Sequence, residues 1–255
     1  MVPVVHIPTS PVALGIAGLQ CLNMMSCVNE MKAPAPYSKF ALAGSPSGAQ
    51  MVSSRTGMAI IYAPALAASL AALATSPSAN GREALTACLL CVHFAKRCGE
   101  VACVHEYSGS VALALSCAIG TFYALVAALI AATQRGVPAG TYAPGAPRAA
   151  LAAFAVGQLG NLWHHASLAA QRKGTSDYVI PTGGLFDACT MPHYLFEIVA
   201  WFGLAFVAGQ LNAVLVAAGM ASYLAGRSVA TTRWYEDKFG TKWPKDRAHL
   251  VPGLF

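Results

Sequence analysis

Charged side chains are scarce in this sequence. Of its 255 residues, 10% are Asp, Glu, Lys or Arg, whereas 56% are hydrophobic. A soluble globular domain carries about a quarter charged residues, and a disordered chain combines high charge with low hydrophobicity, so the composition excludes both classes. The net charge of +6 does not indicate a nucleic-acid partner, because the basic residues do not gather on one soluble face.

Five long runs contain no Asp, Glu, Lys or Arg, and together they cover more than half of the chain. These runs are residues 1–29, 56–81, 107–134, 149–171 and 198–226. Each is long enough for a transmembrane helix, which needs about 20 apolar residues. A transmembrane β-barrel is excluded, because its strands alternate in hydrophobicity, whereas these runs are continuously apolar. The sequence therefore predicts an all-α polytopic membrane protein.

We expect seven transmembrane helices, with the N-terminus outside and the C-terminus in the cytoplasm. The predicted helices lie near 11–29, 58–76, 83–103, 111–133, 148–170, 192–208 and 211–235. The last charge-free run is too long for one span and breaks at the polar turn Gly209–Asn212. In this orientation most Lys and Arg residues face the cytoplasm, as the positive-inside rule requires. The first helix has no signal-peptide pattern and is expected to be retained.

Two familiar kinds of binding motif are missing. There is neither a G-x-G-x-x-G nor a P-loop sequence, so a nucleotide would have to be held by side chains between helices.

The eight cysteines are scattered, and the pair Cys88 and Cys91 lies in an apolar helix, so we expect neither a metal site nor a disulfide framework. Segment 30–56 is rich in Pro, Ser, Gly and Ala and is expected to be the most flexible part.

Ionisable residues within or beside the spans are informative, because each is costly in a membrane unless it is paired or functional. Lys96, Arg97 and Glu100 share one face of the third predicted helix at spacings of three and four residues. Two interpretations remain open for this group. It is either an ion pair at the membrane edge, or Arg97 faces a polar cavity and binds an anionic group.

A polar stripe marks the fifth predicted helix. Asn161, His164 and His165 lie at spacings of three and four residues on an otherwise apolar helix. The stripe runs toward the cations Arg172 and Lys173. This pattern favours the lining of a cavity over isolated core histidines.

A third polar group precedes and opens the sixth predicted helix. A loop that begins at Tyr178 leads into Pro192, which suits the first turn of a helix. His193 and Glu197 then share a face, and Glu197 lies about one turn inside the span, where it needs His193, a cation such as Arg227, or a ligand. Together the three groups predict an intramembrane cavity, open to the cytoplasm, for a phosphate-bearing molecule.

Several stretches resemble the steroid 5α-reductase family, which includes steroid and polyprenol reductases and very-long-chain enoyl-CoA reductases. The stretches are IPTGGLF, PHYLFEIVAWFG, GRSVATTRWYEDKF and WPKDRAHLVPGLF in the C-terminal part, and HFAKRCGEVACVHEYSG in the third helix. The resemblance covers residues 58–255, the expected reductase domain, of which 178–255 is like the family's catalytic part. Residues 1–57 form a generic first helix and variable loop.

The resemblance implies an enzyme of the endoplasmic reticulum membrane. It would use NADPH to reduce a carbon–carbon double bond conjugated to a carbonyl group in a lipid or acyl-CoA substrate. The family's cofactor positions carry over to Arg97, Asn161, Arg172, Tyr178, His193, Glu197, Arg227 and Tyr235. Arginines at these positions would bind phosphate groups, which suit the fork geometry of the guanidinium.

The sequence departs from the steroid reductases where these polarise the steroid ketone. Tyr62 stands where steroid reductases have a Glu in the second helix, and Phe94 stands where they have a Tyr in the third helix. Thr231 stands where the family usually has a His near the C-terminus. We therefore expect an enoyl-CoA or related lipid enone as substrate, with a 3-oxo-steroid or polyprenol as the alternative. Tyr62 is the expected hydroxyl donor, with Tyr194 in reserve.

Two functions outside this class remain as rivals. A transporter would show two related halves with broken helices, and the sequence has no visible internal symmetry. An isoprenylcysteine methyltransferase-like enzyme would also bind a nucleotide cofactor near a C-terminal pair of helices.

Overall fold

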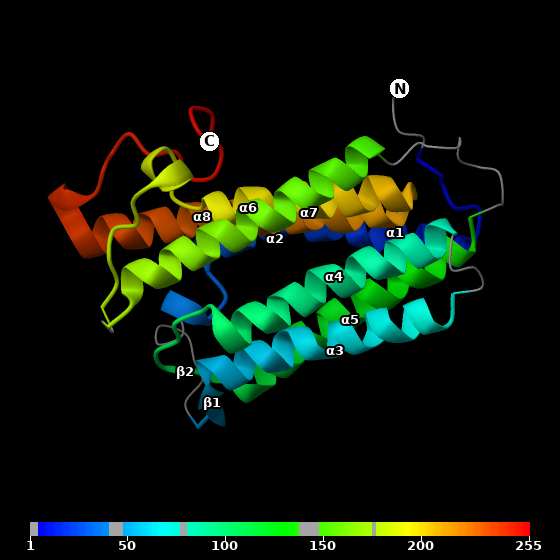
Figure 1. Ribbon diagram of the computed structural model, residues 1–255, viewed down its shortest axis with the longest axis horizontal. Helices are drawn as coiled ribbons and strands as arrows, with labels where there is room; N and C mark the ends of the chain where they lie inside the picture. Colours follow the sequence, from blue (N-terminus) through cyan, green and yellow to red (C-terminus); the bar gives the residue numbers. More distant parts are fainter. Residues whose placement is uncertain (1–4, 41–47, 77–80, 138–147, 175–176) are drawn as a thin grey trace.

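The computed structural model describes residues 5–40, 48–76, 81–137, 148–174 and 177–255 (Figure 1). Helices make up most of it: α1 (Pro11–Leu22), η1 (Asn23–Met25), α2 (Ser26–Lys32), η2 (Ser38–Phe40), α3 (Ser54–Ala74), α4 (Arg82–Cys103), α5 (Leu113–Arg135), α6 (Arg148–Arg172), η3 (Gly184–Asp187), α7 (Pro192–Ala208), α8 (Leu211–Phe239) and η4 (Gly240–Lys242). Two short antiparallel strands, β1 (Met51–Ser53) and β2 (Ser110–Ala112), pair before α3 and α5.

The predicted break in the last charge-free run is confirmed. α7 ends at Ala208, Gly209 adopts the left-handed conformation with φ 63°, and α8 begins at Leu211. Glycine tolerates positive φ because it has no Cβ, so it ends helices readily. The side chain of Gln210 then caps α8 by accepting a hydrogen bond from the backbone N–H of Ala213 at 3.4 Å.

The described helices include four that are long and apolar enough to cross a membrane. They are Pro11–Lys32, Ser54–Ala74, Leu113–Arg135 and Leu211–Lys242, and α7 is a shorter apolar helix. The chain is thus a helical polytopic membrane protein. α4 and α6 contain the charged and polar groups singled out above, so crossing by all seven predicted helices, and their orientation, remain predictions.

The helices form two groups that lie side by side (Figure 1). α3 packs against α4 and α5 in one group, and in the other α7 packs against α6 and α8, with α1 and α2 along α8. α4 and α5 join the groups through α7 and α8. We call the end where the described residues 33–40, 48–53, 104–112, 173–174 and 177–191 lie the loop end.

Glycines allow α6 and α7 to approach closely. A Cβ added at Gly157 would overlap the backbone nitrogen of Ala200, and one at Gly203 would overlap the backbone nitrogen of Phe154. Small residues are common where membrane helices pack, because close backbones gain van der Waals contact where the lipid offers little hydrophobic drive. This contact fixes the polar stripe of α6 against the start of α7.

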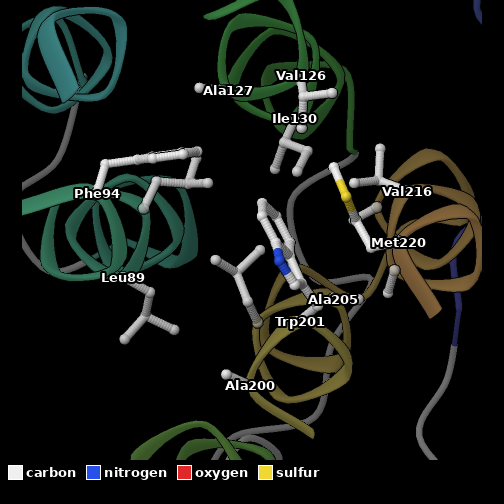
Figure 2. Close-up of a cluster of buried hydrophobic side chains, with 14 of the residues drawn as sticks. Leu89, Phe94, Val126, Ala127, Ile130, Ala200, Trp201, Ala205, Val216 and Met220 are labelled. Carbon is white, nitrogen blue, oxygen red and sulfur yellow. The ribbon is translucent and has the colours of Figure 1, made fainter. Parts of the chain in front are cut away.

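An apolar cluster fills the centre of the bundle (Figure 2). Phe94 of α4, Ile130 of α5, Trp201 of α7 and Met220 of α8 are all at most 5% exposed. The Trp201 ring lies 6.2 Å from that of Phe94, edge to face, as aromatic pairs prefer. This cluster, which we call the central plug, joins the two helix groups.

The expected flexibility of segment 30–56 stays a prediction, although parts of the segment form regular structure. Residues 41–47 lie outside the described residues, but the described parts are folded: Val52 pairs with Val111 in the β-ladder. The Ser53 side chain caps α3 by accepting a hydrogen bond from the Thr56 backbone N–H at 3.1 Å. Composition alone misses such caps and ladders, because they depend on partners elsewhere in the chain.

Candidate functional site

A cavity of about 190 Å³ lies at the loop end, between the two helix groups. Seven of the ten residues expected to donate the proton or bind the cofactor line it: Tyr62, Arg97, Arg172, Tyr178, His193, Tyr194 and Glu197. They come from α3, α4, α6, α7 and the loop before α7. The cavity thus gathers side chains that are up to 135 residues apart in sequence, from Tyr62 to Glu197; its depth in the membrane stays a prediction.

Tyr62 and Arg97 form the closest polar pair in the cavity wall. Arg97 Nη2 donates a hydrogen bond to the Tyr62 hydroxyl oxygen at 2.6 Å, and the guanidinium carbon lies 4.6 Å from the centre of the Tyr62 ring. Both side chains are buried. Because Arg97 occupies the oxygen as a donor, the hydroxyl proton of Tyr62 remains available for another acceptor.

Glu100 forms an ion pair with Arg97 through Nη1, the guanidinium nitrogen that does not contact Tyr62. Its Oε2 accepts a hydrogen bond from Arg97 Nη1 at 2.6 Å, and its Oε1 lies 3.1 Å from Lys96 Nζ and from His165 Nδ1. Glu100 is 1% exposed. Arg97 thus takes part in an ion pair and also lines the polar cavity; its binding of an anionic group stays a prediction.

Glu100, His105 and His165 offer ligand atoms within 4.8 Å of one another, a spacing that a metal ion requires. The cations Lys96 and Arg97, however, already neutralise the Glu100 carboxylate. Burial lowers the pKa of His105, in the loop after α4, which keeps its imidazole neutral and does not itself oppose a metal. A divalent ion here would have to displace two cations, so the geometry favours an ion-pair network over a metal site.

Four buried polar atoms of the cavity lining have no partner in the described residues. They are Arg97 Nε, Tyr107 Oη, Arg172 Nε and His193 Nδ1. An unpaired buried polar group is costly, and most such groups in proteins find a partner. The cavity is therefore suited to a ligand with several hydrogen-bonding groups.

Arg172 stands at the mouth of the cavity. Its guanidinium lies over the Tyr178 ring, 4.6 Å from the centroid, and its Nη2 donates to Ser108 Oγ at 3.2 Å. No described carboxylate pairs with Arg172. Its positive charge is thus available to an anion.

Of the three partners considered for Glu197, namely His193, Arg227 and a ligand, the structure does not realise Arg227. Arg227 does not pair with it; the hydrogen bond to the carboxylate comes from Asn161 Nδ2, at 3.5 Å from Oε2. Asn161 Nδ2 also donates to the His193 carbonyl oxygen at 2.8 Å, and Lys96 donates to Asn161 Oδ1. Asn161 therefore lies behind the lining and fixes the first turn of α7, while Glu197 faces the cavity.

Arg227 and Tyr235 also lie outside the lining. Arg227 pairs with Glu30 of α2. Tyr235 stacks on Trp243, with ring centres 4.8 Å apart and an interplanar angle of 7°. Both belong to the packing around the cavity in this structure.

A basic and aromatic cluster borders the mouth. The Lys39 ammonium lies 4.3 Å from the centre of the Tyr235 ring, 5.3 Å from that of Trp234 and 5.8 Å from that of Tyr178. Burial, with the nearby charges of Arg227 and Arg172, lowers the pKa of Lys39 to about 7.

Sequence reasoning missed several contributors. Tyr37, Tyr123 and Tyr223 line the cavity, Glu30 lies behind it, and Lys39 lies beside its mouth, next to Tyr178. The three tyrosines carry no pattern that separates them from ordinary interfacial or packing residues. Glu30 did carry a signal, since it is an acidic residue at the end of the first charge-free run.

The fold and the cavity define a helical integral membrane protein with a polar, cation-lined site at one end of its bundle. Residues 112–255 match the family model described as 3-oxo-5-alpha-steroid 4-dehydrogenase, which is more than half of the chain. The chain therefore belongs to this family.

Similar proteins include reductases that act on different substrates. The chain is 34% identical over 105 residues to steroid 5-alpha-reductase DET2 of Solanum lycopersicum, covering 41% of each chain. It is 31% identical over 105 residues to a very-long-chain enoyl-CoA reductase of Dictyostelium discoideum (41% of this chain, 35% of the relative). It is 34% identical over 85 residues to human 3-oxo-5-alpha-steroid 4-dehydrogenase 1 (33% and 32%). The matches thus span less than half the length of these relatives.

Proposed function

We propose that the protein is an NADPH-dependent reductase of the double bond in an α,β-unsaturated lipid, such as an enoyl-CoA. The observation that carries this proposal is the Arg97–Tyr62 pair in the wall of a cavity with unpartnered polar atoms. The names of the similar proteins, two kinds of steroid reductase and an enoyl-CoA reductase, support the same reaction class.

The side chains at the cavity offer the groups that a dinucleotide needs, and the cofactor, which is larger than the cavity of about 190 Å³, would extend out of it through the mouth. Phosphate groups would pair with Arg172 and Lys39 at the mouth, since neither cation has a described carboxylate partner. Deeper in the cavity, Glu197 and the unpartnered His193 Nδ1 would accept from or donate to the nicotinamide carboxamide or ribose. Tyr178 would border the adenosine half, with Tyr235 packed behind the lining. When bound, NADPH supplies the hydride that the β-carbon of the double bond accepts.

Tyr62 would stabilise the negative charge that develops on the carbonyl oxygen of the substrate. Its oxygen accepts from Arg97, so its proton can be donated into the cavity. The Arg97 charge in turn stabilises the phenolate that a full proton transfer would leave. Oriented donors of this kind act strongly where water is excluded. Tyr194 also lines the cavity and is the reserve donor.

Phe94 supports an enoyl thioester or lipid enone over a steroid. Phe94 stands at the position that the resemblance assigns to the ketone-polarising Tyr of steroid reductases, and it has no hydroxyl. Its side chain is fully buried in the central plug (Figure 2) and does not line the cavity. Tyr62 would therefore act without the second hydroxyl. A 3-oxo-steroid or polyprenol is the alternative substrate.

The test is a substrate panel with the purified protein in proteoliposomes. NADPH consumption is measured with a trans-2-enoyl-CoA, a 4-ene-3-ketosteroid and a polyprenol, and the products are identified by mass spectrometry. We expect reduction of the enoyl-CoA. If only the steroid or the polyprenol were reduced, that compound would replace the enoyl-CoA as the proposed substrate. Thermal stabilisation by S-adenosylmethionine but not by NADPH would refute a reductase. Localisation to the endoplasmic reticulum membrane can be tested by fractionation.

A further inference from the structure

Arg227 is enclosed by protein groups, although the family resemblance places it among the cofactor ligands. It is 2% exposed and forms an ion pair with Glu30. Its Nη1 also donates to the Ala35 carbonyl oxygen and its Nη2 to the Tyr37 carbonyl oxygen, each at 3.0 Å. A buried guanidinium needs many acceptors, and the segment between α2 and β1 supplies these.

Glu30 binds the same segment through the backbone N–H of Ala35. It is 4% exposed, and its two carboxylate oxygens lie 3.2 and 3.1 Å from the Ala35 backbone nitrogen, which donates to them. Glu30 and Arg227 thus bind the N–H and the C=O of one residue, Ala35. Since Glu30 belongs to α2 and Arg227 to α8, the pair fastens residues 33–40 to both helices.

The fastened segment places a cavity side chain. The Arg227 guanidinium stacks on the Tyr37 ring, 3.9 Å from its centroid. The Tyr37 hydroxyl lies 2.7 Å from that of Tyr223, and Tyr194 lies near the Arg227 charge. All three tyrosines line the cavity. Arg227 therefore reaches the cavity through tyrosines and does not line it.

We propose that Glu30 and Arg227 are positioning residues, which clamp segment 33–40 so that Tyr37 forms one wall of the cofactor cavity. Arg227 acts through Tyr37 and its neighbours, not by contact with the cofactor. The proposal deepens the proposed function and rests on it only where NADPH is the ligand. A direct contact between Arg227 and a phosphate group is the competing assignment.

The two assignments predict different changes in NADPH affinity when the Glu30 carboxylate is removed. If Arg227 bound phosphate directly, removing the Glu30 carboxylate would free its charge and leave NADPH affinity unchanged or higher. If the pair is a clamp, removing either partner releases the same segment. The affinity then falls in both variants, and removing both residues costs no more than the larger single loss.

The experiment measures the NADPH dissociation constant for Glu30→Ala, Arg227→Ala and the double variant. We expect each single variant to bind about tenfold or more weakly, a cost typical of misplaced binding groups, and the double variant to match them. Arg233→Ala is the matched control, because Arg233 is also on α8 and donates to the Met31 carbonyl oxygen of α2 at 3.3 Å, but is exposed. Unchanged or tighter binding by Glu30→Ala, with weaker binding by Arg227→Ala, would overturn the proposal.

A second measurement does not depend on the nucleotide. Glu30→Gln keeps an acceptor for the Ala35 N–H but loses the charge that holds Arg227, and it guards against misfolding of the alanine variant. Without NADPH, we expect faster amide hydrogen exchange in residues 33–40 of this variant than in the wild type, and no change in α6. Wild-type protection in 33–40 would exclude the clamp. Failure of the wild type to bind NADPH would instead refute the proposed function.

Discussion

Arg97 and Tyr62 are 35 residues apart in sequence, yet their side chains meet at 2.6 Å in the wall of the cavity. Glu100 holds the opposite edge of the same guanidinium, also at 2.6 Å. The three residues form a line from a buried carboxylate, through a cation, to a hydroxyl that faces the cavity. Each of these three residues is expected to have a different function, so substitutions at each should have different effects on stability, cofactor binding and turnover.

Tyr62→Phe should lower turnover and leave cofactor binding intact. Loss of an oriented proton donor typically costs about 10²–10³-fold in kcat, while the ring and its contact with Arg97 remain. The measurements are steady-state kinetics on the enoyl-CoA and the NADPH dissociation constant. Tyr123→Phe is the control, because Tyr123 also lines the cavity but lies on α5. Wild-type turnover by Tyr62→Phe would assign the donor role elsewhere, with Tyr194 as the first candidate.

Glu100→Gln should weaken both the fold and the reaction. Breaking a buried ion pair leaves an uncompensated charge and costs about 3–5 kcal/mol, so the thermal unfolding temperature should fall. Because Glu100 would act through Arg97 and Tyr62, adding Glu100→Gln to Tyr62→Phe should cause little further loss of turnover. Equal additional losses in the two backgrounds would contradict this coupling.

Glu83→Gln is the matched control for Glu100. Glu83 pairs with Arg135 at 2.7 Å, but Arg135 is 46% exposed, and exposed pairs contribute about 0–1 kcal/mol. We expect neither stability nor turnover to change measurably.

NADPH affinity should decrease as the pH rises above 7. The pKa of Lys39 is lowered to about 7, so the free protein has a charged ammonium below pH 7 and loses it above. A bound phosphate favours the charged form and raises this pKa, so binding above pH 7 requires uptake of a proton. Titration calorimetry across this range should show the decline, and Lys39→Gln should flatten it. An equally steep decline in Lys39→Gln would assign the titration to another group.

Gly157→Ala should destabilise the protein without changing the residues of the cavity. The added Cβ would overlap the backbone of Ala200, and overpacking typically costs about 1–3 kcal/mol. Gly99→Ala is the control, since a Cβ there meets nothing within 4 Å, and alanine favours a helix by about 1 kcal/mol over glycine. The unfolding temperature in detergent should fall for the first variant only. An unchanged temperature would mean that α6 and α7 can separate at no cost.

The sequence predicted the positions of the helices well, because most of them lie largely in runs without charged residues. It also predicted which residues share a helix face, since Lys96, Arg97 and Glu100 follow from the helical period. Contacts between helices that are distant in sequence could not be predicted. Arg227 pairs with Glu30, 197 residues away, and no local sequence pattern indicates that pairing. The tyrosines Tyr37 and Tyr223 were missed for the same reason, because packing alone places them at the cavity.

The central plug has an electrical consequence. Phe94 packs edge to face on Tyr123 of the cavity wall, with ring centres 5.8 Å apart, so the plug begins where the cavity ends. A polar cavity that enters a bilayer from one side thins the insulating layer beneath it. Much of any transmembrane voltage would then fall across the side chains of Trp201, Ile130 and Met220. Their apolar packing would thus keep a charged site from becoming an ion leak.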